Sequence, residues 1–128
     1  MHDVDSPWQH GVVLICNNQR PDGSPKPSCG RDAGNQLKAW LKIAAREGGG
    51  AAAECRVLTT SCLDVCPQHG VAVALMPGNE VVVVDPQEDR DALLARVQAH
   101  MDAVAEQGAP TGPGRRGRGL LRRLRGAD

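Results

Sequence analysis

The chain has 128 residues, of which 41% are hydrophobic, with neither Phe nor Tyr and a formal net charge of zero at pH 7. This length suits one domain of ordinary size and excludes a second large hydrophobic core. The sequence has no basic-then-apolar signal segment and no apolar run of the roughly 18 residues that a membrane span needs. We therefore expect a cytoplasmic protein.

The zero net charge hides an asymmetry between the body and the end of the chain. Residues 1–109 carry nine Lys/Arg against 14 Asp/Glu, a formal charge of −5, whereas residues 110–128 carry six Arg and one Asp. The segment 108–128 is rich in Gly, Pro and Arg and too poor in apolar residues to order itself. We predict an N-terminal extension over 1–10, a folded domain over 11–107 and a disordered basic tail over 108–128.

The first half of the domain predicts a strand, a loop and a helix. Residues 11–16 (GVVLIC) form a short branched apolar run, typical of a buried strand that ends at Cys16. Residues 17–28 contain three prolines and predict a surface loop. A helix is expected over 31–47, ended by three glycines at 48–50, because apolar residues recur there at helical spacing: Leu37, Trp40, Leu41, Ala44 and Ala45.

The second half predicts three strands and a helix. Residues 53–60 (AECRVLTT) indicate a strand, and residues 61–70 a loop. Two Val-rich strands, over 71–76 and 81–84, are joined by Pro-Gly-Asn, which is typical of a hairpin. Asp85 followed by Pro86 predicts the start of a helix whose apolar face is Leu93, Leu94, Val97, Met101 and Val104. The predicted order is β-α-β-β-β-α, an α/β domain.

Four of the five cysteines fall in or beside the predicted loops: Cys16, Cys29, Cys62 and Cys66. Four thiolates in two pairs are the ligands that a small iron–sulfur cluster needs. In a reducing compartment, cysteines are more often ligands or free thiols than disulfides. The fifth, Cys55, lies in the predicted second strand without a close partner in sequence, and we interpret it as a buried, inert thiol.

The segments around these cysteines resemble those of the thioredoxin-like 2Fe-2S ferredoxins, over roughly residues 11–104. The matching motifs are Cys16-Asn-Asn-Gln-Arg20-Pro21-Asp-Gly23, then Ser28-Cys29-Gly30, then Cys62-Leu63-Asp64-Val65-Cys66. The resemblance implies a thioredoxin-like fold with a mixed four-stranded sheet and two helices. It also implies a 2Fe-2S cluster bound by all four cysteines, and a one-electron carrier rather than an enzyme.

The partners that this function implies are redox oxidoreductases, with no small-molecule substrate. We expect them to dock on the 17–28 and 61–70 loops, and a homodimer stays open because family members often pair. For the Arg-rich tail three interpretations stay open: a solubilising end, a clamp on an acidic partner or anionic membrane surface, and nucleic-acid binding.

Other functions remain as alternatives. Four thiolates also suit a structural zinc site, although such sites usually draw on two close pairs and here only Cys62 and Cys66 are close. A thiol–disulfide oxidoreductase would need a Cys-x-x-Cys pair, which the chain lacks. His69 as a ligand would lack the second histidine that Rieske centres use. A cluster-based redox sensor is the main alternative to the carrier.

Two features of the loops bear on the expected charge of such a cluster. Backbone N–H groups, including those at the helix start near Gly30, are expected to point at the sulfurs and favour negative charge. The carboxylate of Asp64 should act in the opposite direction and lower the reduction potential.

Overall fold

The computed structural model describes residues 1–19, 23, 29–65, 67 and 69–107. Its elements follow the predicted order, with one short 3₁₀ helix added. They are β1 (Val12–Cys16), α1 (Arg31–Gly48), the 3₁₀ helix η1 (Ala51–Glu54), β2 (Arg56–Thr60), β3 (Val71–Met76), β4 (Glu80–Val84) and α2 (Arg90–Glu106). The predicted tail lies outside the described residues.

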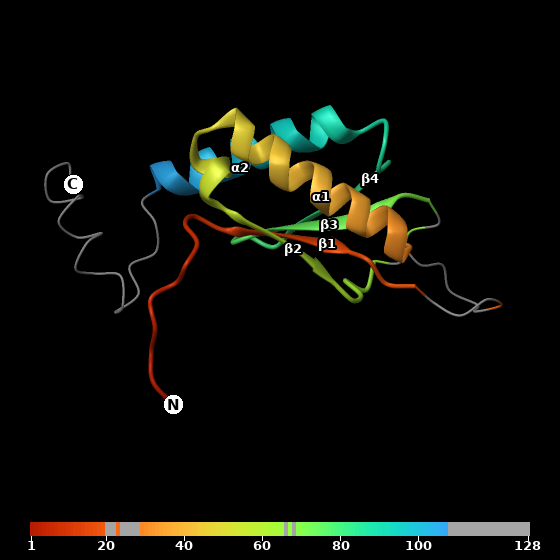
Figure 1. Ribbon diagram of the computed structural model, residues 1–128, viewed down its shortest axis with the longest axis horizontal. Helices are drawn as coiled ribbons and strands as arrows, with labels where there is room; N and C mark the ends of the chain where they lie inside the picture. The colour runs from red at the N-terminus through yellow and green to blue at the C-terminus, as the bar shows by residue number, and fades with distance from the viewer. Residues whose placement is uncertain (20–22, 24–28, 66, 68, 108–128) are drawn as a thin grey trace, which may run out of the picture.

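The strands form a mixed four-stranded sheet in the order β2-β1-β3-β4. β1 runs parallel to β2 and antiparallel to β3, and β3 pairs antiparallel with β4. Both helices cover one face of this sheet (Figure 1). The predicted α/β architecture is therefore confirmed.

The hydrophobic core fills the space between the sheet and the two helices. Strand residues at alternate positions face it, among them Val13, Ile15, Val73 and Leu75. α1 contributes Leu37, Leu41 and Ala45, four residues apart, and α2 contributes Leu93, Val97 and Met101. This core is aliphatic, because Trp40 is only partly buried at its margin, where the Arg90 guanidinium lies 5.3 Å from the ring centroid.

The prediction of one continuous strand over 53–60 was wrong in its first part. Ala51–Glu54 forms η1, and β2 begins only at Arg56, where it pairs with Val12. The segment AAAE has no β-branched residue, and its Ala52 is buried in the core. Cys55 therefore lies between η1 and β2, and not inside a strand.

The last helix begins at Arg90, four residues later than the predicted first position at Pro86. The Asp85 carboxylate does accept hydrogen bonds from the N–H groups of Gln87 and Glu88, at 2.9 and 2.8 Å, as a helix cap would. However, the Asp89 carboxylate turns back to accept the Asp85 N–H at 2.7 Å, which closes residues 85–89 into a separate turn. α2 starts after that turn, at Arg90.

Neither α1 nor α2 is long and apolar enough to cross a membrane, and these two are the α-helices of the described residues.

The fully buried Leu75 tests how much the aliphatic core contributes to stability. Leu75→Ala removes a side chain with no solvent exposure, so we expect the free energy of unfolding to fall by about 3 kcal/mol. The matched control is Ile43→Ala, because Ile43 is 57% exposed on α1 and should change the free energy by less than about 0.5 kcal/mol. Urea titration of both variants measures the difference, and equal losses would contradict this core assignment.

Candidate metal centre

Three of the four predicted ligand cysteines lie at one end of the sheet. The parallel register of β1 and β2 pairs Cys16 with Thr60, so the two strands end side by side. Cys62 follows β2 by two residues, and Cys29 stands two residues before α1 begins. The ends of β1 and β2 and the beginning of α1 come together at this end of the molecule (Figure 1).

Cys16 is the most buried of these thiols, with 2% of its surface exposed. Its Sγ–H donates to the carbonyl oxygen of Ser61 at 2.9 Å, and its sulfur accepts the Asn18 N–H at 3.5 Å. The thiol therefore joins the end of β1 to the loop that follows β2.

Cys29 connects the group to β3 and to the other two thiols. Its sulfur accepts the Ala72 N–H at 3.4 Å and lies close enough to the Cys16 thiol to feel its charge. Burial raises the pKa of Cys29 to about 11, against the lowering effect of the Ala72 N–H; the nearby charges of Cys16 and Cys62 add to the rise. The metal-free thiol is therefore protonated at neutral pH and must release its proton to become a ligand.

Cys62 lies beside the carboxylate of Asp64, which the sequence predicts to influence the reduction potential of a cluster. Its sulfur accepts the Asp64 N–H at 3.3 Å, and Asp64 Oδ1 lies 4.0 Å from the same sulfur. The backbone of Asp64 has a left-handed φ of 64°, which aspartate and asparagine tolerate better than most residues. This geometry turns both the N–H and the carboxylate of Asp64 toward Cys62.

The remaining site predictions have different outcomes. Cys66 lies outside the described residues, and within those residues no three Cys, His, Asp or Glu side chains form a ready metal-binding group. His69 is exposed. The Gly30 N–H donates to the carbonyl of Asn18 at 2.9 Å, so the expectation that it points at a sulfur was wrong.

The donor set nevertheless fits a thiophilic metal group. Three soft sulfur donors lie at the same end of the sheet, and each sulfur accepts one backbone N–H, from Asn18, Asp64 or Ala72. These hydrogen bonds favour negative charge on sulfur, which is the form that binds metal.

Sequence reasoning missed the residues that hold α1 against this site. Gln19 Oε1 accepts the Arg31 N–H at 3.2 Å, and Asn17 Nδ2 donates to Asn35 Oδ1 at 3.0 Å. Gly34 is buried so close to β1 that a Cβ there would overlap the carbonyl oxygen of Cys16 and lie 2.8 Å from Asn17 Cα. A glycine inside a predicted helix was the one available signal, because it weakens a helix unless close packing requires it.

We expect Gly34→Ala to push α1 away from the Cys16 peptide and to lower the free energy of unfolding by about 1–3 kcal/mol. Gly48→Ala in the same helix is the matched control, since its Cβ would meet only the flexible Gln98 amide, at 2.7 Å from Nε2. Chemical denaturation measures both. Equal stability of the two variants would show that α1 does not depend on this close approach.

Comparison with known proteins places this geometry in a known fold. No family model matches the chain, and no curated protein matches it either. The chain is similar to the thioredoxin-like 2Fe-2S ferredoxin from Aquifex aeolicus, with a TM-score of 0.57 and 19% identity over 81% of this chain and 99% of that one. Another structure of that ferredoxin gives 0.58 and 21% over 83% and 97%, and a cysteine-to-serine variant gives 0.59 and 19% over 80% and 99%. The expected thioredoxin-like fold is confirmed: this chain has the fold of these ferredoxins.

Proposed function

We propose that this protein is a one-electron carrier of the ferredoxin type, which holds a 2Fe-2S cluster through Cys16, Cys29, Cys62 and Cys66. The observation that carries the proposal is that Cys16, Cys29 and Cys62 lie at one end of the sheet: the Cys16 thiol donates to the carbonyl of Ser61, next to Cys62, and the Cys29 sulfur accepts the Ala72 N–H at the start of β3. Three separate elements, a strand end, a helix start and a loop, place thiols at the same end of the sheet. Packing alone does not require this arrangement, so we infer that the thiols act together. The likeness to a 2Fe-2S ferredoxin supports the same conclusion.

The protein's own residues have three tasks in this function. The cysteines would bind as thiolates, so Cys29 would have to release the proton that burial favours on its sulfur. The backbone N–H groups of Asn18, Asp64 and Ala72 stabilise negative charge on sulfur. The surrounding fold fixes the ligand positions, so that little has to move when charge changes. A bound cluster would supply a single reversible one-electron step between two oxidation states.

Electron transfer needs a short path between the cluster and the protein surface. Cys62 is partly exposed, and the next residues, Asp64 and Val65, are exposed, Val65 by 41%. We therefore place the docking surface for redox partners on the 61–70 loop together with the 17–28 loop. The acidic body, with its formal charge of −5 over residues 1–109, suits partners with basic patches and salt-sensitive association. No catalytic step on a small molecule is part of this proposal.

The ligand assignment predicts a clear pattern among cysteine variants. Serine at position 16, 29, 62 or 66 should lose the cluster or change its spectrum, because a hydroxyl is a poorer ligand for iron than a thiolate. Cys55→Ser is the control and should keep full iron and sulfide, since Cys55 lies at the opposite end of β2. Metal and sulfide analysis with low-temperature EPR of anaerobically purified protein measures the outcome.

Two results of that experiment would count against the proposal. Stoichiometric zinc without sulfide, obtained with ample iron and sulfide, would favour the zinc site. Loss of the cluster in Cys55→Ser, with the cluster retained in the other four variants, would contradict the ligand assignment.

The position of Asp64 beside Cys62 predicts how the reduction potential of the proposed cluster responds to a nearby charge. Asp64→Asn removes the carboxylate 4.0 Å from Cys62 but keeps a residue that tolerates the left-handed backbone, so the N–H bond to sulfur should persist. We expect the midpoint potential to rise by an amount on the order of tens of millivolts, since an exposed charge is largely screened.

Asp102→Asn, which changes an exposed carboxylate near the end of α2 and beside the glycines that follow α1, is the matched control for this shift. Spectroelectrochemical titration compares both variants with the parent protein. A shift of the same size in both variants would contradict a local effect of Asp64.

A further inference from the structure

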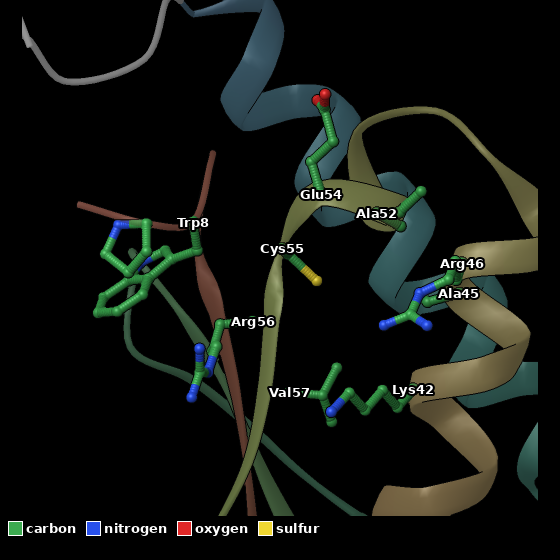
Figure 2. A pocket seen from close by; sticks show the side chains of 11 residues that line it. Trp8, Lys42, Ala45, Arg46, Ala52, Glu54, Cys55, Arg56 and Val57 are labelled. Carbon is green, nitrogen blue, oxygen red and sulfur yellow. The ribbon is translucent and has the colours of Figure 1, made fainter. Parts of the chain in front are cut away.

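A second polar feature lies at the other end of β2 from the cysteines. A cavity of about 280 Å³ is bounded by the last turns of α1, by η1, by the beginning of β2 and by Trp8. Figure 2 shows Lys42 and Arg46 reaching from α1 into the same space as the Cys55 sulfur, with Trp8 and Arg56 on the other side of the β2 ribbon. β2 is an edge strand, since it has a neighbouring strand on one side only, and the cavity extends around its free edge.

The cavity collects positive charge on a body that is otherwise acidic. Lys42, Arg46 and Arg56 line it, three of the seven Lys and Arg residues that the structure describes. Glu54 is the only carboxylate among the described lining residues, and it accepts a hydrogen bond from His10 Nε2 at 3.0 Å. Figure 2 shows the Glu54 side chain pointing away from the cavity, so it does not neutralise the cations.

The three cations are exposed and come from two elements of the fold, α1 and β2. Lys42 and Arg46 are four residues apart on α1 and therefore share one face of the helix. The Arg56 guanidinium lies 5.9 Å from the ring centroid of Trp8, which fixes it as the opposite wall. Among the described residues no carboxylate forms an ion pair with Lys42 or Arg46.

Helix-end electrostatics explain only part of this arrangement. A cation in the last turn of a helix is stabilised by the carbonyl end of the helix dipole, and this accounts for Arg46. It does not account for Arg56, which belongs to β2 and lines the cavity from the other side of that strand (Figure 2). Repulsion among three cations around one hollow is relieved most directly by an anion inside it.

We propose that this cavity binds the phosphate group of a small anion, at a site separate from the cysteines. Two guanidinium groups offer the paired N–H donors that match phosphate oxygens, and Lys42 adds a third positive charge. The cavity lies near the lower end of the roughly 300–1,000 Å³ of small-molecule pockets, so the ligand is a small molecule and not a polymer. Cys55 lines the cavity as a neutral thiol, since burial raises its pKa to about 11.

The test is an NMR titration of the full-length, cluster-loaded protein, with ¹⁵N label, at constant ionic strength set by chloride. One arm uses inorganic phosphate and the other glycerol phosphate, and the tighter ligand tells whether the site takes free phosphate or a phosphate ester. We expect saturable shifts at the amides of residues 53–57 and at the Trp8 indole. These groups lie at the far end of β2 from the cysteines, where paramagnetic broadening is weakest.

Variants connect the shifts to the cavity. Removing two charge-assisted contacts in the double variant Lys42→Gln with Arg46→Gln should weaken binding about tenfold or more. Arg56→Gln provides a second, independent test from the opposite wall. Lys38→Gln is the matched control, because Lys38 lies one turn earlier on α1 and does not line the cavity.

Circular dichroism and the visible spectrum of each variant establish that fold and cluster are intact. Shifts confined to the Arg-rich residues 110–128, or unchanged affinity in the double variant, would overturn the proposal.

Discussion

The parallel pairing of β1 with β2 is the constraint on which the rest of the site depends. It sets Cys16 opposite Thr60, and the chain therefore leaves both strands at the same end, where the Ser61 carbonyl accepts the Cys16 thiol. A parallel pair needs a crossover, and α1 provides it while packing on the sheet. That helix begins two residues after Cys29, so one topological requirement brings three separate stretches of chain to the same end of the sheet.

The sequence predicted correctly the strands and helices that have a strong hydrophobic pattern. It did not predict the segments whose conformation depends on individual packing contacts or side-chain hydrogen bonds. The branched run over 12–16 and the uninterrupted apolar run over 71–76 are strands because side chains on both faces are buried or nearly so. The alanine-rich stretch 51–54 carries no such signal, and packing of Ala52 beneath the helices decides its conformation. At residues 85–89 a second aspartate closes a turn that a single capping residue would have opened into a helix.

The candidate site, like the fold, could be predicted only in part from the sequence. Cysteine spacing singled out Cys16, Cys29 and Cys62, which the structure places at one end of the sheet. The side chains that fix those loops, such as Gln19 and Asn35, look like ordinary surface residues until the fold is known. Gly34 is the clearest case, because its importance lies in the distance between two backbones and not in any property of its own. The N–H groups that donate to the cysteine sulfurs belong to the backbone, so no pattern of side chains in the sequence indicates them.

The length of β2 has a consequence for how the two ends of the molecule communicate. Five residues of extended chain span about 17 Å, roughly twice the distance over which physiological salt screens a charge. An ion held beside Arg56 would therefore exert little electrostatic force, through solvent, on charge at the sulfur of Cys62. Any influence of one end on the other would have to travel mechanically, as a small displacement of the strand itself, and would persist at high ionic strength.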